Sequence, residues 1–523
     1  MKLKLIVLIL GCGLFGVGIV AFRDRTMAQG PGAPAFSPAI PKTWDDAAMA
    51  TLEVPLADPV GSPKHVSADY YYRIPVHPIY RQYPVYAPGH EPPGYMDWLK
   101  QQAPVSVWDA AGHRPGLHSE ADWIKAGEIV FSAHEDITQS EGVFALPDVS
   151  STPWYKKTGM PVTREGVLPF LNYVVREKGK VELGSFSCAM CHTRVMPDGN
   201  VLKGAQGNIP FERALGYALE TRFNRDDARV LERQLFSAPW LRPDPEQPEQ
   251  RMEAGEIASL HEAAPPGVVP RHRTSPFYPV QVPDLIGVKD RHYLDRTGLQ
   301  QQRGIVDLMR YAALNQGADD YASYDGFIPA AAPEFKTLPA PDKLNPDVAQ
   351  LDRYSDEQLY ALALYVYSLK PPPNPNKSDA LAQRGEKVFE REGCAMCHTP
   401  PLYTNNKLTL AEGFTPPPGA DQKYDILPIS VGTDPSLTLK TRRGTGYYKV
   451  PSLKSVWYRG MFGHSGWCAT LEDWFDPRRT RDDYVPTGFK PYGAKTYAVK
   501  GHPFGLDLSA RDKKALIAFL RTL

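Results

Sequence analysis

The stretch Ala380-Leu-Ala-Gln-Arg-Gly-Glu-Lys-Val-Phe-Glu-Arg-Glu-Gly-Cys-Ala-Met-Cys-His398 determines the architecture of the C-terminal part of the chain. Its first twelve residues have the apolar spacing of a helix, and Gly393 ends that helix just before a Cys-x-x-Cys-His motif. An earlier segment repeats this order. The helical pattern of residues 121–133 contains Ala-Gly-Glu-Ile-Val-Phe and precedes a second Cys-x-x-Cys-His motif at residues 188–192. Two copies of one pattern predict two structural units in tandem.

The two Cys-x-x-Cys-His motifs have a definite chemical use. Two thiols on one turn can add across the two vinyl groups of a porphyrin, and the adjacent histidine is then held beneath the iron. Two cysteine pairs could instead share one tetrahedral zinc ion, but a histidine follows each pair directly. We therefore predict two covalently bound haem c groups. The predicted cofactor-binding residues are Cys188, Cys191, His192, Cys394, Cys397 and His398, with His192 and His398 as iron ligands.

Each unit is predicted to close with a second helix, at residues 355–369 and 509–523, each beginning at a serine that can cap it. The expected fold is mainly α: two tandem cytochrome c-like helical domains with long Pro/Gly-rich loops and insertions, after an N-terminal membrane anchor. The first copy carries one insertion between Phe131 and Cys188 and another after Gly207. The expected divisions are an anchor (1–25), a Pro/Tyr-rich tether and wrapping segment (26–99), an N-terminal cytochrome c-like domain (100–370), a Pro-rich linker (371–379) and a C-terminal electron-transfer domain (380–523).

The composition limits the function. Lys plus Arg and Asp plus Glu both total 59 among 523 residues, so the formal net charge is zero and nucleic-acid binding is not expected. The 52 prolines and 27 tyrosines indicate long ordered loops rather than a bundle of helices alone.

The N-terminus indicates export. An apolar run from Leu5 to Phe22 follows two lysines, and its length is close to the minimum for a membrane-spanning helix. We predict an uncleaved signal anchor and a periplasmic protein tethered to the inner membrane. A cleaved signal peptide, which would release the protein, and a lipoprotein anchored at Cys12 are the alternatives.

A second axial ligand for the C-terminal haem should come from downstream of its motif. The candidates are His464, Met461 and His502, and we favour His502 over His464. A low-spin haem that carries electrons takes His or Met on its far side, whereas a haem that performs chemistry leaves that side open.

The sequence from about residue 100 to residue 523 resembles the bacterial di-haem cytochrome c peroxidase superfamily, most closely from Gly432 to Leu523. The matching strings are Val450-Pro-Ser-Leu-Lys-Ser-Val-Trp457, Phe462-Gly-His-Ser-Gly466 and Ala469-Thr-Leu-Glu-Asp473. That superfamily also contains the methylamine-utilisation di-haem enzyme and the rubber oxygenases. The spacing of the two haem motifs and the closing Arg-Thr-Leu are most similar to the rubber-oxygenase-like branch.

The resemblance implies a division of labour between the haems. The C-terminal haem would be six-coordinate and would exchange electrons with a redox protein. The N-terminal haem would bind the small-molecule oxidant, peroxide or dioxygen. The peroxidases have Met as the second ligand of the C-terminal haem, whereas His502 would lower its potential. Calcium between the domains is common in the family, although no ligand set here identifies it.

The resemblance also indicates candidate catalytic residues. The family's peroxidases have a Trp between the haems, where this chain offers Tyr293 as a redox stepping stone. They place a Glu and a Gln on the distal side, where this chain offers Arg310, Asn315 and Gln316 and no Glu. Without a carboxylate, cleavage of a peroxide O–O bond lacks its usual acid–base helper, and such a pocket suits dioxygen better.

Three functions remain open from the sequence. The first is a periplasmic di-haem cytochrome c peroxidase-like oxidoreductase that reduces hydrogen peroxide or activates dioxygen at the N-terminal haem, with the C-terminal haem relaying electrons. The second is a rubber-oxygenase-like dioxygenase acting on an apolar alkene. The third is a non-catalytic di-haem electron-transfer cytochrome. Fold similarity alone does not separate them.

Overall fold

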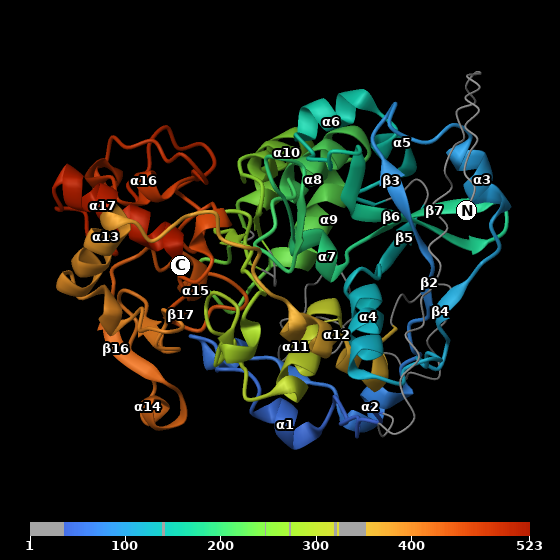
Figure 1. The fold of residues 1–523 in the computed structure, drawn as a ribbon, viewed down its shortest axis with the longest axis horizontal. Coiled ribbons are helices and arrows are strands. Elements are labelled where there is room, and N and C mark those ends of the chain that lie inside the picture. Colours follow the sequence, from blue (N-terminus) through green and yellow to red (C-terminus); the bar gives the residue numbers. More distant parts are fainter. Residues whose placement is uncertain (1–35, 139–141, 246, 271–273, 318–321, 324–351) are drawn as a thin grey trace, which may run out of the picture.

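The computed structural model describes residues 36–138, 142–245, 247–270, 274–317, 322–323 and 352–523. Two helical units lie side by side, with the C-terminal unit in orange and red at the left of Figure 1. Within these ranges, no helix has both the length and the apolar composition needed to cross a bilayer. The anchor predicted at residues 1–25 lies outside the described residues.

The first unit is built on the crossing of α4 (Glu120–Phe131) and α12 (Asp356–Ser368). The helices approach so closely at Gly127 that a Cβ atom there would lie 1.9 Å from the carbonyl oxygen of Ala361. Both helices were predicted from the sequence, and both are confirmed. The Ser355 side chain caps α12 by accepting a hydrogen bond from the Gln358 backbone N–H, as its position before the apolar stripe indicates.

The second unit repeats this crossing with α13 (Ala380–Arg391) and α17 (Ala510–Thr522). A Cβ atom on Gly385 would lie 1.9 Å from the carbonyl oxygen of Ala515. Gly127 and Gly385 occupy the same place in the repeated Gly-Glu-x-Val-Phe pattern. The helices at both ends of the predicted repeat therefore form equivalent pairs, and in each pair the glycine allows the two backbones to touch.

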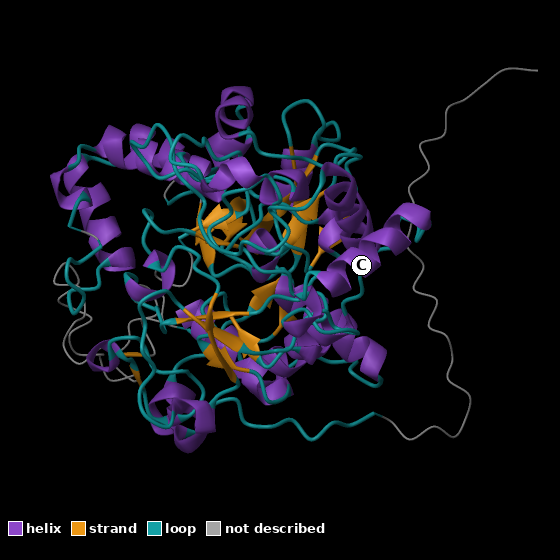
Figure 2. Cartoon of the chain, turned by 90° about the vertical axis from the view of Figure 1, so that its left-hand side faces the viewer, coloured by secondary structure: helices purple, strands orange, loops and turns teal. Residues whose placement is uncertain are grey.

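A four-stranded antiparallel sheet in the first unit was not expected from the sequence. Its strand order is β3-β6-β7-β5. The strands are β3 (Gln82–Tyr86), β6 (Val167–Glu177), β7 (Lys180–Ser185) and β5 (Asp136–Thr138). Three of them fill the insertion between Phe131 and Cys188, and β3 comes from the segment before residue 100. In Figure 2 the strands lie inside a surrounding layer of helices and loops.

A helical layer covers one end of the sheet and follows the first haem motif. It consists of α8 (Phe211–Thr221), α9 (Arg225–Phe236) and α10 (Ala254–Glu262). A fully buried ionic group joins the three helices, in which the His261 ring contacts Glu212 through Nδ1 and lies 2.8 Å from Glu232 through Nε2. Burial by itself lowers the pKa of His261, but the carboxylates of Glu232 and Glu212 offset this and raise it to about 10. Burial raises the pKa of Glu212.

Residues 36–99, the described part of the chain before residue 100, belong to the first unit. Trp44 stacks on Tyr71 with ring centres 4.3 Å apart, and both side chains belong to the core that contains α4 and α12. The N-terminal helices of this segment, α1 (Asp46–Ala50) and α2 (Ala68–Arg73), lie below that core in Figure 1. Aromatic residues of the Pro/Tyr-rich stretch therefore act in packing.

The remaining elements are α11, which is as long as α12, and a set of shorter helices and strands. The helices are α3 (Tyr95–Gln101), α5 (Leu146–Val149), α6 (Thr152–Thr158), α7 (Cys188–Cys191), α11 (Ile305–Gly317), α14 (Ala420–Lys423), α15 (Ser436–Leu439) and α16 (Leu471–Trp474). The strands are β1 (Lys64–His65), β2 (Ile79–Tyr80), β4 (Ser106–Trp108), β8 (Thr193–Val195), β9 (Val201–Lys203), β10 (Val268–Val269), β11 (Val280–Gln281), β12 (Tyr293–Leu294), β13 (Gln300–Gln301), β14 (Ala322–Ser323), β15 (Leu408–Leu410), β16 (Ile426–Ser430) and β17 (Tyr447–Lys449). Strands β16-β15-β17 form a small sheet in the second unit.

Candidate haem sites

The C-terminal motif lies at the surface of the second unit. Gly393, with a φ of 70°, ends the helical stretch, and Cys394–Met396 then form one turn of 3₁₀ helix. The thiols of Cys394 and Cys397 are free and only half-buried. Met396 between them is 59% exposed. Two free thiols on one turn are the donor set that thioether attachment of a porphyrin needs.

The His398 ring is oriented by the backbone. Its Nδ1 lies 3.1 Å from the Pro451 carbonyl oxygen and 3.2 Å from that of Tyr403. A carbonyl oxygen can only accept, so Nδ1 is the donor and Nε2 keeps its lone pair. Burial lowers the pKa of His398, which favours the neutral imidazole that a metal requires.

A cavity of about 240 Å³ opens beside this motif. Its apolar wall includes Phe389, Leu453, Val456, Leu471, Phe475, Phe504, Leu516 and Leu520. His502 lies across the cavity from His398, and the two ring centres are 6.4 Å apart. Two metal–nitrogen bonds of roughly 2 Å, plus roughly 1 Å from each nitrogen to its ring centre, give about 6 Å. One iron atom therefore fits between these rings.

The His502 loop is held in an unusual backbone conformation. His502 has a φ of 44°, and Gly501 before it has a φ of 78°. A Cβ atom at position 501 would also clash with the backbone of Thr433. The buried guanidinium of Arg479 donates to the carbonyl oxygens of Gly501 and His502 at 3.0 and 2.9 Å. Burial lowers the pKa of His502 to about 3. Its Nδ1 is buried and has no hydrogen-bond partner among the described residues.

His464, the other histidine proposed as an iron ligand, lies in the same cavity but in different surroundings. Its ring stacks on Tyr448 with centres 4.2 Å apart and meets Trp467 edge-on at 4.4 Å. Its Nδ1 lies 3.1 Å from the Ser465 hydroxyl, and its Nε2 is buried without a hydrogen-bond partner in the described part of the chain. Met461 also lines this cavity. The structure thus brings all three candidates for the second axial ligand of the C-terminal haem to one cavity, and it sets His502 opposite His398.

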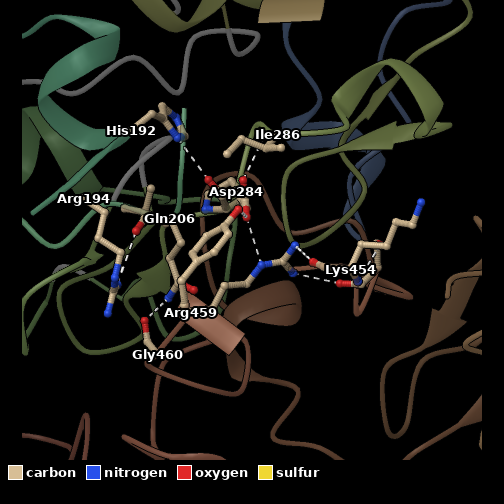
Figure 3. Close-up of polar contacts among 12 residues, drawn as sticks. His192, Arg194, Gln206, Asp284, Ile286, Lys454, Arg459 and Gly460 are labelled. Atoms are coloured by element: carbon tan, nitrogen blue, oxygen red, sulfur yellow. Dashed lines mark hydrogen bonds and ion pairs between the residues drawn. The ribbon is translucent and has the colours of Figure 1, made fainter. Parts of the chain in front are cut away.

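The N-terminal motif is more enclosed. Helix α7 is capped by the Ser187 side chain, and Cys191 is buried while Cys188 is half-buried against the α4–α12 core. The Nδ1 of His192 lies 3.0 Å from the Pro283 carbonyl oxygen, so this ring is oriented in the same way as that of His398. Figure 3 shows this contact. The cavity beside His192 has a volume of about 20 Å³.

The candidate distal residues lie on α11, whose buried face packs in the α4–α12 core. The guanidinium of Arg310 donates to the Asp307 carboxylate and to the Thr43 carbonyl oxygen, both at 2.9 Å. Neither Arg310 nor the half-buried Asn315 lines the cavity beside His192. The side chain of Gln316 lies outside the described residues. Contact between these side chains and an oxidant stays a prediction.

Tyr293 lies where the two units meet. Its hydroxyl accepts a hydrogen bond from the Asp425 backbone N–H at 2.8 Å. It lines a pocket that also includes Pro283 and Pro451, the two residues whose carbonyl oxygens orient the proximal histidines. Tyr293 therefore lies near the backbone groups that orient both proximal histidines, whereas its place between two haems and its redox role stay predictions.

The two units are joined by polar contacts next to the first motif (Figure 3). The Asp284 carboxylate accepts from the Arg459 Nε at 2.9 Å and from the Tyr458 hydroxyl at 2.7 Å. Gln206 donates to the Gly460 carbonyl oxygen. The sequence analysis singled out none of these residues. The only available signal was that Asp284 directly follows a proline, which did not distinguish it from other loop residues.

The donor sets at both motifs fit haem c. Each offers two cysteines and one histidine whose Nδ1 already contacts a backbone carbonyl oxygen, and the C-terminal site adds a facing imidazole across an apolar cavity. Among the described residues, no group of three or more His, Cys, Asp or Glu side chains is arranged to hold a metal ion. The two cysteine pairs therefore form no shared zinc site there, and the calcium ion implied by the resemblance has no such ligand group.

Comparison with known proteins adds little. Neither a protein-family model nor a curated protein matches the sequence. Among solved structures, Kuenenia stuttgartiensis hydrazine synthase pressurized with 20 bar xenon is similar over 57% of this chain and 87% of its own, with 15% identity and a TM-score of 0.27. A MauG-like protein associated with microbial copper homeostasis is similar over 35% of this chain, with 19% identity and a TM-score of 0.22. This chain covers 59% of that protein. At these TM-scores, neither likeness supports an argument about fold or function.

Proposed function

We propose that this protein is a di-haem c-type oxidoreductase that reduces hydrogen peroxide or activates dioxygen at its N-terminal haem. The C-terminal haem relays electrons from a redox protein. The observation that carries the proposal is the pair of facing imidazoles, His398 and His502, across a cavity that opens at the free thiols of Cys394 and Cys397.

The contrast between the two motifs supports the division of labour. Among the described residues, those that line the cavity beside His192 are Cys191, Val280, Val282, Pro283, Asp295 and Arg296, and these include no second imidazole or thioether. Two strong axial ligands favour electron transfer, whereas one leaves the iron open to an oxidant. The half-buried C-terminal motif is also the more accessible of the two to a protein partner.

Bound haem would supply one-electron redox chemistry at each site. The chain itself orients His192 and His398 through their Nδ1–H groups, which raises the basicity of the nitrogen facing the iron. Tyr293 is proposed to assist electron transfer between the sites. Arg310, Asn315 and Gln316 are proposed to contact the oxidant, although the Arg310 guanidinium would first have to leave Asp307.

The decisive experiment is spectroscopy of protein made in a host that matures c-type cytochromes. Pyridine haemochrome analysis should return two haems per chain, and EPR should show one high-spin and one low-spin iron. Stopped-flow mixing with hydrogen peroxide, and turnover assays with dioxygen and polyisoprene, then identify the substrate. Fewer than two haems per chain, or zinc in their place, would overturn the proposal.

A non-catalytic electron carrier is the second candidate. The half-buried thiols of Cys394 and Cys397, at the surface of the second unit, favour it because they suit electron exchange with a protein partner. Two low-spin signals that do not respond to peroxide or dioxygen would establish this function instead.

The proposal includes export to the periplasm with the segment 1–25 as a membrane tether. Cell fractionation should place the full chain in the inner-membrane fraction, and deletion of that segment behind a cleavable signal should release it. Recovery of the full chain in the cytoplasm would contradict this part of the proposal.

A further inference from the structure

A pocket lined by positive charges lies between the two haem motifs. Its walls include the side chains of Arg291, Arg296, Lys449 and Arg459. They also include Pro283 and Pro451, whose carbonyl oxygens accept hydrogen bonds from the two proximal histidines. A single residue, Pro283 on one side and Pro451 on the other, therefore separates the pocket from each proximal histidine.

Within the described ranges, one of the four cations, Arg459, has a carboxylate partner. Arg459 pairs with Asp284 at 2.9 Å. Arg291 donates to the carbonyl oxygens of Asp284 and Ile286, and Arg296 donates through Nε to the Gln281 carbonyl oxygen at 3.1 Å.

The nearest polar contact of the Lys449 ammonium is the Tyr293 carbonyl oxygen at 3.4 Å. Of the residues that the structure describes, no carboxylate forms an ion pair with Arg291, Arg296 or Lys449.

The charges in this pocket are unbalanced. Among the described residues, four cations face three carboxylates, Asp284 in the wall and Asp290 and Asp295 close by, so the excess is one positive charge. Burial, together with repulsion from neighbouring cations, lowers the pKa of Arg291 to about 10 and that of Arg296 to about 9. Buried cations without anionic partners are costly, so the pocket favours an anionic ligand.

Arg296 has a special position among these cations. It lines the small cavity beside His192, the large cavity between His398 and His502, and the pocket itself. Lys449 and Arg459 line the pocket and the large cavity but not the small one. A carboxylate from either haem can therefore approach Arg296, whereas Lys449 is accessible from the C-terminal side.

We propose that this pocket receives propionate carboxylates from both haems, and that Arg296 is the one side chain that contacts both sets. Lys449 contacts only those of the C-terminal haem. The inference rests on the proposed function, because it requires both haems to be present. It also assigns the space between the units to anions, since a calcium ion would be repelled by the same cations.

A positive charge fixed near a haem disfavours the ferric state, which carries one more positive charge than the ferrous state, and so raises the reduction potential. Removal of the Arg296 charge should lower the potentials of both haems. Removal of the Lys449 charge should lower only that of the C-terminal haem. This pattern separates a shared contact from a general loss of stability.

The test is a spectroelectrochemical titration of the full-length di-haem protein and its variants. The variants are Arg296→Gln, Arg296→Lys and Lys449→Gln, with Arg481→Gln as a control that removes one exposed arginine of the second unit. EPR of the same samples assigns each potential to the high-spin or the low-spin haem. Arg296→Gln should shift both potentials negatively, Arg296→Lys should retain most of each value, and the control should leave both unchanged.

Two outcomes overturn the inference. One is an Arg296→Gln protein with two haems and only one shifted potential, or none. The other is a Lys449→Gln protein whose N-terminal potential shifts as much as its C-terminal potential. Haem counting on the wild-type protein comes first, so a deficit there refutes the proposed function, whereas a normal count with unshifted potentials refutes this inference alone. If Arg296→Gln does not fold, Lys449→Gln and Arg296→Lys still decide the matter.

Discussion

Replacement of Arg479 by glutamine should loosen the loop that presents His502. The Arg479 guanidinium is fully buried and donates to the carbonyl oxygens of Trp474 at 2.8 Å, Gly501 at 3.0 Å and His502 at 2.9 Å, and also to that of Val499. A glutamine amide has two N–H donors and a shorter reach, so it can keep at most two of these four contacts.

The expected effect is large enough to detect. Hydrogen bonds from a charged donor contribute roughly 1.5–3 kcal/mol each, so the loss of two costs about 3 kcal/mol or more. At about 1.4 kcal/mol per factor of ten, the open form of the loop becomes roughly 100-fold more populated. Because His502 also has a positive φ, the strain in its backbone favours opening once the carbonyl contacts are lost.

The assay is carbon monoxide binding to the reduced protein, combined with EPR of the oxidised protein. The wild type should bind carbon monoxide at the N-terminal haem only. Arg479→Gln should add a second binding phase and convert part of the low-spin signal to high-spin. Arg478→Gln, which removes the neighbouring exposed arginine, is the matched control and should behave as wild type. If Arg479→Gln lowers thermal stability but leaves carbon monoxide binding and the low-spin signal unchanged, Arg479 does not position the ligand.

Three further predictions concern the fold and the second site. His502→Met should raise the potential of the C-terminal haem, measured by redox titration, because a thioether ligand favours ferrous iron more than imidazole does; an unchanged potential would show that His502 is not a ligand. His261→Gln should lower the free energy of unfolding by roughly 3–5 kcal/mol at neutral pH, since it leaves buried carboxylates without a cation. The folded-state pKa of His261, about 10, lies above the unfolded value, so the stabilisation is complete below about pH 6.5 and is lost as the pH rises through about 10. Free energies of unfolding from denaturant titrations over that range should therefore converge for wild type and variant. Curves that stay parallel would contradict the assignment. Gly385→Ala should destabilise the second unit by roughly 1–3 kcal/mol or more, because the new Cβ would clash with the carbonyl oxygen of Ala515. Gly255→Ala is the control, since nothing lies within 4 Å of its new Cβ, and it should be neutral or stabilising in the same thermal melts.

The helices next to the haem motifs could be predicted because their signals are local. The apolar spacing in residues 380–391 and the capping serine before α12 depend on residues within a few positions of one another, and α4, α12, α13 and α17 are all confirmed. The repeated Gly-Glu-x-Val-Phe pattern lies at the two helix crossings. The sequence alone did not explain why glycine begins the pattern, whereas the structure shows Gly127 and Gly385 packed against backbone carbonyl oxygens.

The four-stranded sheet was missed because its pattern is weak within each strand. Strand β6 contains Pro169 and Asn172, which interrupt an apolar run, and its partner β3 lies about 90 positions earlier in the sequence, as the Gln82–Asn172 contact illustrates. The turn at Lys178-Gly179 was the one local sign of a hairpin. Pairing between distant segments is not recorded in the periodicity of either segment.

The site residues show the same limit. The thiols and proximal histidines are specified by a five-residue motif, whereas the carbonyl oxygens that orient the histidines belong to prolines 53 and 91 positions further along the chain. The cationic pocket combines side chains from residues 291, 296, 449 and 459, and no stretch of the sequence places them together. Such residues become visible only once the two units are packed.

The exposed thioether of Met396 has a consequence for the proposed reaction with peroxide. Sulfur in this setting is readily converted to the sulfoxide, which is polar and chiral. Because 59% of the side chain is accessible, and because Cys397 beside it and Cys394 two positions before it carry the porphyrin in the proposed holoprotein, this methionine should be oxidised early. The oxygen content of the peptide around residue 396, followed by mass spectrometry, would then record how much oxidant each molecule has encountered.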